Sequence, residues 1–243
     1  MTIALGFHAS DGVILCADMQ KTIGEMKSYD GKVDLFIYPQ AGVIIAIAGA
    51  GNDDYIQTAK SYVLDGFSRR RSWPALEKGL KNRLLSFFDT HLSRWANFPI
   101  MERPTAELLI GVTGDEMPTA LFHYEGTSFS RVQTKAKAIG LGVLLAQDLL
   151  DRYEHCTVLT SSEAASLGTY ILSKVKRGVE SCGGPTHIVG LRKGMDFAFT
   201  AKKEIEKLEE ELLNDEEDAN KRFVETIRNR PLPLSWQSEH RKK

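Results

Sequence analysis

The sequence lacks the features that mark secreted, membrane-spanning or disulfide-stapled proteins. Its three cysteines, Cys16, Cys156 and Cys182, are odd in number and far apart, so we expect no disulfide framework and a reducing compartment. The apolar stretch at 41–50 is much shorter than the roughly 20 residues of a membrane span. The N-terminal apolar stretch is short, has no basic flank and contains turn residues, unlike a secretory signal. These absences predict a cytoplasmic protein without a membrane partner.

Neither positive nor negative charge is in marked excess. Lysine and arginine total 31 and aspartate and glutamate 32, which leaves a formal net charge of −1 and argues against a nucleic-acid partner. The six histidines are scattered without the spacing of metal ligands, and no glycine-rich phosphate-binding motif is present. We therefore expect no metal and no cofactor. The hydrophobic share of 42% and the charged share of 26% fit one soluble globular domain.

What is present is an alternation of strand and helix patterns that predicts an α+β protein. Apolar runs bounded by turn residues predict strands over 2–8, 12–18, 33–38, 43–48, 106–113, 117–124, 128–132, 136–140, 186–192 and 195–200. Helical spacing predicts helices over about 53–67, 74–96, 143–154 and 161–178, the last opened by a capping box of Thr160 and Glu163. In the second helix, the apolar stripe expected to face the core is Leu76, Leu80, Leu84, Phe88, Leu92 and Trp95. Two sheets packed face to face with helix pairs outside would bury this order of elements.

The tail differs from the rest of the chain. Residues 202–230 are rich in charge, with sparse apolar residues at helical spacing that 214–218 interrupts. This pattern fits one or two solvated helices packed weakly on the body, and it fits equally a contact with a neighbouring subunit. The last ten residues are expected to be disordered. We divide the chain into a domain at 1–200 and a charged helical extension at 201–243.

The N-terminus carries a candidate nucleophile. Thr2 follows Met1 directly, and removal of Met1 would give Thr2 a free α-amine that can act as base for its own hydroxyl. The second strand of the expected hairpin ends on Asp18, which would bring a carboxylate back beside Thr2. An ordinary edge hairpin that begins with threonine is the alternative interpretation of these residues. Because only Met1 precedes Thr2, self-cleavage of a long leader is not required.

Several segments resemble one family. Residues 2–6, 11–18 and 21–24 look like the start of a proteasome β-type subunit and are similar to the bacterial HslV-like peptidases. Residues 43–49 resemble the family's strand leading to an Ala-Gly turn, and 138–142 and 183–189 resemble two further segments in the family's order. The resemblance covers about residues 2–195. It implies a four-layer α/β/β/α sandwich of the N-terminal nucleophile (Ntn) hydrolase type.

The resemblance also implies a role for each matching residue. Thr2 would be the nucleophile, and Lys32 stands where the family's active-site lysine falls, with Lys27 as the rival position. A nearby ammonium lowers the pKa of the threonine hydroxyl and amine and stabilises the alkoxide. Asp18 would orient Lys32, and the N–H of Gly49 would face the developing negative charge of the acyl transition state.

Substrate contacts follow from the same comparison. Thr22 is similar to the position that pairs with the substrate backbone. Lys21, Ile47, Gly51 and Tyr55 fall where the family lines its specificity pocket, and Lys21 would favour acidic side chains if it points inward.

The chain departs from the family in the polar groups that support its site. Leu141 stands at the position of the family's serine beside the threonine amine and can neither donate nor accept a hydrogen bond. In the later acid-x-x-serine element, Val179 replaces the acid and Cys182 the serine. A carboxylate lies one position away at Glu180, but a one-residue slip in an extended segment reverses the direction of the side chain. Weak or unusual activity is therefore compatible with the sequence.

Three functions fit these residues. The preferred one is a threonine-type hydrolase that cleaves peptide bonds in a peptide or protein substrate, within a homo-oligomer that sequesters the site. The second is an Ntn amidase acting on a small amide. The third is a non-catalytic scaffold subunit, which the replacements at Leu141 and Val179 favour. The set of Thr2, Asp18, Lys32 and Gly49 favours the first, because a scaffold has no physical need for it.

Overall fold

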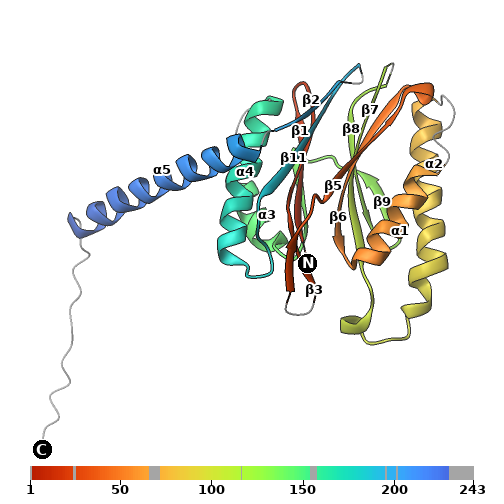
Figure 1. Cartoon of the computed structure of the whole chain (residues 1–243), viewed down its shortest axis with the longest axis horizontal. Coiled ribbons are helices and arrows are strands. Elements are labelled where there is room, and N and C mark those ends of the chain that lie inside the picture. Colours follow the sequence, from red (N-terminus) through yellow and green to blue (C-terminus); the bar gives the residue numbers. More distant parts are fainter. Residues whose placement is uncertain are drawn as a thin grey trace, which may run out of the picture.

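Two five-stranded antiparallel sheets form the centre of the protein (Figure 1). The computed structural model describes residues 2–23, 26–65, 72–115, 117–153, 158–194, 196–200 and 202–229. The first sheet has the order β10 (Ala136–Gly140), β1 (Ile3–Ala9), β2 (Gly12–Asp18), β11 (Thr186–Arg192) and β12 (Asp196–Phe199). The second has the order β5 (Val33–Tyr38), β6 (Val43–Gly51), β7 (Ala106–Gly114), β8 (Ala120–Glu125) and β9 (Ser128–Arg131).

Helices cover the outer face of each sheet. Figure 1 shows α3 (Val143–Arg152) and α4 (Ser161–Gly178) beside the first sheet, and α1 (Asp53–Leu64) and α2 (Trp73–Phe87) beside the second. The expected capping box of α4 is present, with the Thr160 side chain accepting from the Glu163 N–H and the Glu163 carboxylate accepting from the Thr160 N–H. Every expected strand and helix of the body has a counterpart in the structure, and apart from the end of the helix expected over 74–96 the ends differ by a few residues.

Strand β6 contributes side chains to the cores on both faces of the second sheet. Its residues are apolar on both faces, because Ile45 and Ile47 pack toward α1 and α2 while Ile44, Ala46 and Ala48 pack toward the first sheet. Side chains alternate between the faces of a strand, so a strand buried on both sides reads as a continuous apolar run. The continuous run at 43–48 is therefore the sequence signature of a strand between two core layers.

Three details differ from the expectations. A short hairpin of β3 (Gln20–Ile23) and β4 (Met26–Tyr29) follows β2, where no strand was expected. The α-helical part of the second helix ends at Phe87; the chain continues as a π-turn over Phe88–Leu92 and a 3-10 turn over Ser93–Trp95. Phe87 is buried in place of Phe88, because Phe87 lies three residues after the buried Leu84 and shares its face of the α-helix.

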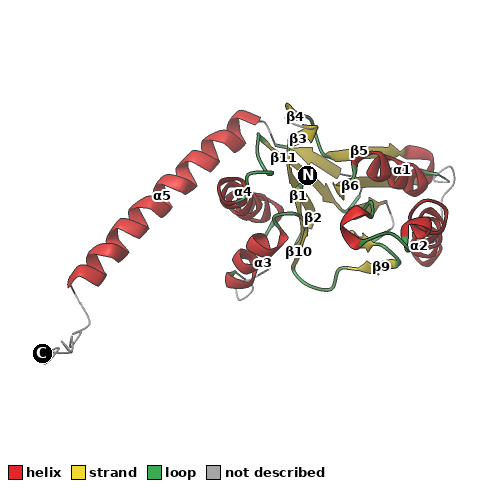
Figure 2. Cartoon of the chain, turned by 90° about the horizontal axis from the view of Figure 1, so that it is seen from below, coloured by secondary structure: helices red, strands yellow, loops and turns green. Residues whose placement is uncertain are grey.

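The C-terminal helix α5 (Lys202–Asn229) runs without a break through 214–218. Figure 2 shows it beside α4 at its start and projecting away from the body toward its end. The expected disorder of the last ten residues concerns positions outside the described ones. Among the described residues, no helix has the length and the apolar character needed to cross a membrane.

A partly buried ionic network fixes the first half of α5. Lys176 of α4 donates to Glu209 Oε1 of α5 (2.6 Å) and to Thr186 Oγ1 (2.9 Å), and Thr186 donates to the same carboxylate oxygen (2.5 Å). Lys174 pairs with Glu216, which lies seven residues or about two turns further along α5. The side chains of Lys176 and Glu209 are only 11% and 19% exposed, so solvent screens this pair less than a surface pair. The helix is thus attached to the segment that leads into β11.

Replacing Glu209 with Gln should loosen α5, because it leaves the Lys176 ammonium partly buried without a carboxylate. We expect a loss of about 1–3 kcal/mol in the free energy of unfolding, measured by urea titration. Glu211→Gln is the matched control, since Glu211 forms an exposed pair with Lys207 on the same helix. Equal effects of the two substitutions would show that the Lys176 network does not hold the helix.

Candidate active site

Thr2 lies immediately before β1 and is held by the end of β10. The Leu141 N–H donates to the Thr2 carbonyl oxygen (3.1 Å), and the β1–β10 ladder pairs Ile3 with Gly140. Gly140 has a φ of 98°, and a Cβ at this position would come within 2.0 Å of the Thr2 carbonyl oxygen. Only glycine allows the two strands to approach so closely here. Thr2 is 7% exposed.

Asp18 is the fully buried centre of the site. Its Oδ1 accepts hydrogen bonds from the Ile3 N–H (3.1 Å) and from the Lys32 ammonium (2.9 Å). Its Oδ2 accepts from the Gly183 N–H (3.0 Å). A buried carboxylate needs such compensation, because removal of its hydration is costly unless charge and hydrogen bonds replace it. Asp18 therefore connects the residue after Thr2, the candidate lysine and the loop before β11.

Lys32 reaches Asp18 because of the path of the chain before β5. The Asp30 N–H donates to the Met19 carbonyl oxygen (2.9 Å), which ties this segment to the end of β2. The β5–β6 ladder begins with Val33 opposite Ala48, so the preceding Lys32 stands next to the edge of β6 at Gly49. Lys32 is 6% exposed. The structure thus brings Asp18, Lys32 and the start of β1 together, and it sets Gly49 beside them.

Thr2 opens onto a cleft of about 960 Å³. One wall contains Gly51 and the residues after it, where the Asn52 N–H donates to the Thr105 carbonyl oxygen (2.8 Å). Gly140 and Leu141 also line the cleft, together with Trp95, Ala96 and residues 100–106. The volume is in the range of sites that take small molecules and short peptides.

The residues expected to bind substrate fall into three groups. Gly51 lines the cleft, and the Tyr55 hydroxyl accepts from Trp95 Nε1 (3.1 Å), a residue of the cleft wall. Ile47 is fully buried in the core between the second sheet and its helices, so it exposes no surface to the cleft in a single chain. Lys21 and Thr22 belong to β3, but their side chains lie outside the described part, as does that of Lys27.

The supporting polar groups of the family are absent at the matching positions. Leu141 lines the cleft and is 52% exposed. Val179 packs against the core between the first sheet and α4, so it does not stand in for an acid at the site. Cys182 is buried near Asp18 and Lys32. Burial, and to a lesser extent the negative charge of Asp18, raise the pKa of its thiol to about 11, while the positive charge of Lys32 acts in the opposite direction. The thiol is therefore neutral at physiological pH.

Sequence reasoning missed two contributions to the site. The Gly183 N–H binds Asp18, and Glu107 Oε2 accepts from the Gly140 N–H (3.2 Å) on the far side of the Thr2 strand pair. Both contacts join residues far apart in the chain, and neither residue type carries a local signal for them. The first depends on the loop before β11 and the second on the packing of the two sheets against each other.

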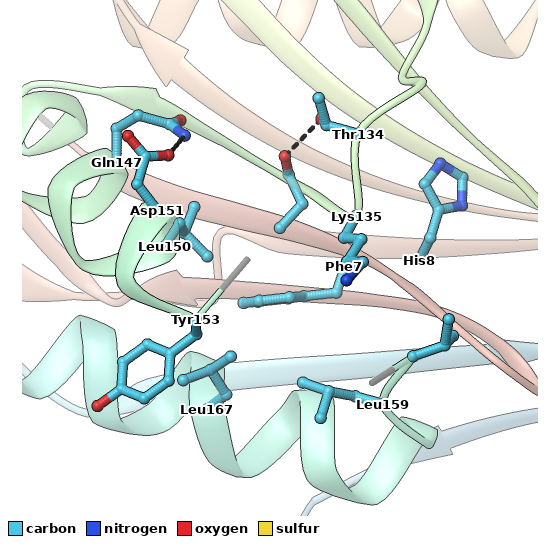
Figure 3. Close-up of a pocket in the computed structure, with 12 residues that line it drawn as sticks. Phe7, His8, Thr134, Lys135, Gln147, Leu150, Asp151, Tyr153, Leu159 and Leu167 are labelled. Carbon is cyan, nitrogen blue, oxygen red and sulfur yellow. Dashed lines mark hydrogen bonds between the residues drawn. The ribbon is translucent and has the colours of Figure 1, made fainter. Parts of the chain in front are cut away.

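A second hollow lies at the opposite end of β1. It measures about 70 Å³ and is lined by Phe7, His8, Leu150, Tyr153 and Leu159, among others (Figure 3). Burial lowers the pKa of the His8 ring, whose Nε2 lies 3.0 Å from the Val132 carbonyl oxygen. The hollow is too small for a peptide, and Thr2 is five residues away along the extended strand, about 17 Å.

One group of side chains in the Thr2 cleft has the composition of a metal site. Glu107, His123 and Glu125 place their ligand atoms within 4.8 Å of one another. Glu107 and Glu125 also line the cleft. Among the described residues this is the group whose arrangement fits a metal ion, and it was not visible in the spacing of the histidines.

The described part of the chain has the fold seen in solved structures of Anbu, one of which is described as an ancestral beta-subunit. No protein-family model matches the sequence, and no curated protein matches it either. The likeness is to solved structures of Anbu. The Anbu (Gly-1) mutant from Hyphomicrobium sp. strain MC1 superposes with a TM-score of 0.74 at 15% identity, covering 97% of this chain and 100% of the other.

Two further Anbu structures agree. Anbu, described as an ancestral beta-subunit, from Yersinia bercovieri gives a TM-score of 0.68 at 15% identity, over 97% of this chain and 100% of that one. The helical assembly of the Anbu complex from Pseudomonas aeruginosa gives 0.71 at 14% identity, over 98% of this chain and 100% of that one. Similarity at this level of identity establishes a shared fold.

Because Asp18 and Lys32 are buried and paired, we expect substitutions of the two residues to have non-additive effects on the free energy of unfolding. Asp18→Asn should lower the free energy of unfolding by about 3–5 kcal/mol, because it leaves the buried Lys32 ammonium without its carboxylate. Adding Lys32→Met should recover part of this loss, since the uncompensated charge is then removed. Urea titrations of the single and double variants measure both effects.

Asp148→Asn is the control for this pattern. Asp148 forms an exposed pair with Arg152, with the two side chains 58% and 66% exposed, so its loss should cost less than about 1 kcal/mol. A similar small cost for Asp18→Asn would contradict the account of the buried pair.

Proposed function

We propose that the protein is a threonine-type N-terminal nucleophile hydrolase that cleaves peptide bonds within a self-assembled, proteasome-like oligomer. In this proposal residues 1–200 form a four-layer Ntn-hydrolase domain in the cytoplasm, and 201–243 form a helical extension. The observation that carries the proposal is the Lys32 ammonium held at 2.9 Å from buried Asp18, whose same oxygen accepts the N–H of the residue after Thr2. This contact supplies a fixed positive charge beside the candidate nucleophile.

The chemistry begins with removal of Met1. An ordinary α-amine has a reference pKa of about 7.7–8.0, so a useful fraction is neutral near pH 7. The free amine of Thr2 is proposed to accept the hydroxyl proton directly or through water. The hydroxyl oxygen attacks the substrate carbonyl, and the C–N bond breaks as the leaving amine takes up the proton. Water then hydrolyses the resulting ester and restores Thr2.

Charge stabilisation is assigned to two groups. The Lys32 ammonium stabilises the negative charge that forms on the threonine oxygen, and Asp18 holds the ammonium in place. The N–H of Gly49, at the edge of β6 next to Lys32, is the proposed donor to the carbonyl oxygen of the transition state. A peptide in the cleft would pass Gly51 and the Trp95 wall, and Lys21 and Thr22 are proposed to contact it from β3.

Self-assembly is proposed from the fold likeness. The Pseudomonas aeruginosa structure is described as a helical assembly of the Anbu complex. In this chain, Ile100 and Met101 of the cleft are 78% and 96% exposed, and Leu144 of α3 is 86% exposed. Subunit contacts commonly bury side chains of this kind. An oligomer that covers the cleft would limit access to unfolded or short peptides.

A second candidate is a non-catalytic scaffold subunit with the same fold. It is favoured by the apolar Leu141 in the cleft and by the neutral thiol of Cys182 beside Asp18. The family places hydroxyl groups at both positions, and positioned hydroxyls assist proton transfer. An Ntn amidase acting on a small amide would use the same residues and differ only in substrate.

The proposal predicts a graded set of variants. Thr2→Ala should lower the hydrolysis of fluorogenic peptides by at least about a thousandfold, because the attacking oxygen is lost. Lys32→Ala should cost nearly as much, whereas Lys27→Ala should leave turnover within about twofold. Circular dichroism of each variant, recorded at the assay temperature, verifies that the fold persists.

Two results would argue against these assignments. Unchanged turnover in Thr2→Ala would remove Thr2 from the mechanism. Loss of turnover in Lys27→Ala together with normal turnover in Lys32→Ala would transfer the active-site charge from Lys32 to Lys27.

A further inference from the structure

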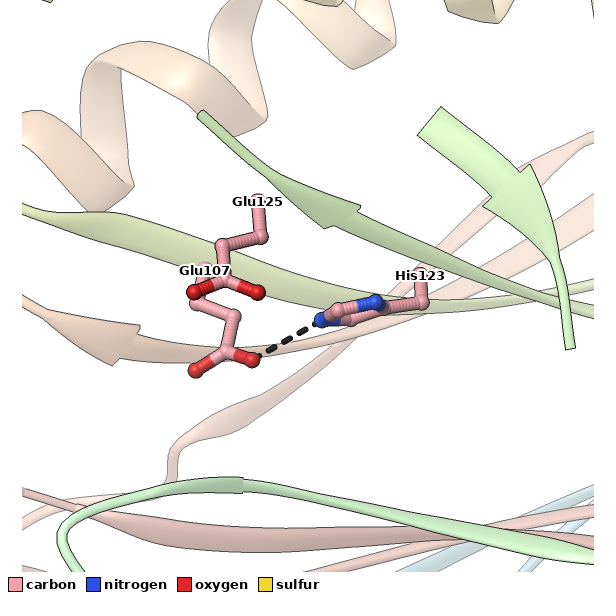
Figure 4. Close-up of side chains that lie close together, drawn as sticks. All are labelled: Glu107, His123 and Glu125. Carbon is pink, nitrogen blue, oxygen red and sulfur yellow. Dashed lines mark hydrogen bonds and ion pairs between the residues drawn. The ribbon is translucent and has the colours of Figure 1, made fainter. Parts of the chain in front are cut away.

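The cluster of Glu107, His123 and Glu125 is a product of sheet register. Glu107 on β7 pairs directly with Glu125 on β8. His123 stands two residues before Glu125 on the same strand, so the three side chains share one face of the sheet. Figure 4 shows them converging from the two strands, with the imidazole directed at the Glu107 carboxylate.

The cluster has an unfavourable balance of charge without a cation. Like charges directly opposite each other on neighbouring strands are destabilising. One carboxylate oxygen of Glu107 lies 2.8 Å from His123 Nε2, and the other accepts from the Gly140 N–H. His123 thus faces one carboxylate by hydrogen bond and a second at close range, which is more negative charge than one imidazole can balance.

We propose that Glu107, His123 and Glu125 bind a divalent transition-metal ion such as Zn²⁺. Carboxylate oxygen and imidazole nitrogen are both ligands of such ions, and the imidazole favours them over Mg²⁺ or Ca²⁺. The ligand atoms lie within 4.8 Å of one another. At metal–ligand distances of about 2.0–2.2 Å, tetrahedral ligands are roughly 3.4 Å apart, so the ligand atoms need to approach one another by at most about 1.4 Å.

The exposure of the three side chains suits this role. His123 and Glu107 are 12% and 21% exposed and fixed by hydrogen bonds, while Glu125 is exposed at the end of β8 and can move onto the ion. Three protein ligands leave a coordination position open, and Glu107 and Glu125 line the cleft that also contains Thr2. An ion held by these residues would therefore lie beside the cleft.

The site is linked to the N-terminal strand through Glu107. Its second oxygen accepts from the Gly140 N–H, and Gly140 pairs with Ile3, the residue after Thr2. A metal ion bound to the Glu107 carboxylate would therefore be connected, through Gly140, to the strand pair that positions Thr2. The proposal concerns binding and does not depend on the hydrolase activity.

Titration of the full-length, untagged and chelator-treated protein with Co²⁺ tests the proposal. The visible ligand-field absorption of Co²⁺ reports coordination without any assay of activity. We expect an absorption that saturates at one Co²⁺ per chain and is displaced by Zn²⁺. Loss of a residue that only hydrogen-bonds to a metal ligand typically weakens metal binding by about 10–100-fold. Glu125→Gln and His123→Gln each remove a proposed ligand, so each should weaken Co²⁺ binding by at least that much.

Glu102→Gln is the matched control, because Glu102 lines the same cleft outside the cluster. This variant and Thr2→Ala should bind Co²⁺ with the affinity of the unaltered chain. The Co²⁺ titration therefore tests the metal site whether or not Thr2 is a nucleophile. Absence of a saturable absorption would overturn the proposal. So would an unchanged affinity in both Glu125→Gln and His123→Gln, since Glu125→Gln alters only an exposed side chain and the fold does not depend on it.

Discussion

The buried carboxylate of Asp18 is the constraint on which the candidate site depends. It accepts hydrogen bonds from the Ile3 N–H of β1, from the Gly183 N–H in the loop before β11, and from the ammonium of Lys32. A charge in this place is stable only while its partners remain, so each contact helps to fix the others. The start of β1, and with it Thr2, is thereby held against a positive charge and next to the open edge of β6.

The same constraint extends outward into the fold. Thr186 pairs with Asp18 across β2 and β11, and its hydroxyl donates to Glu209 of α5. Lys176 joins that carboxylate to the carbonyl oxygen of Gly184, next to Gly183. The first half of the charged helix thus braces the loop that binds Asp18. On the other side, Glu107 binds Gly140 and so supports the second strand that flanks Thr2.

Much of the body could be predicted from the sequence, because its signals are local. Apolar periodicity predicted the strands and helices, and Thr160 with Glu163 marked the start of α4. The β3–β4 hairpin was missed because its short strands, Gln20–Ile23 and Met26–Tyr29, lack the apolar run that marked most of the other strands. The Asp18–Lys32 contact followed from a family resemblance and not from any local pattern. Ile47 was expected to line a pocket but is a core residue, since the alternation of β6 turns it toward the helices. The Glu107–His123–Glu125 cluster depends on strand register, which the positions of the histidines in the sequence do not reveal.

The central claim is that Thr2 is a working nucleophile with a free amine. Intact-mass spectrometry of the purified protein, before and after exposure to an epoxyketone or a β-lactone, tests it most directly. The account predicts a mass without Met1 and the gain of one adduct, mapped to Thr2 and absent from Thr2→Ala. Retention of Met1 with no adduct would contradict it, because the amine that must serve as base would then be blocked in a peptide bond.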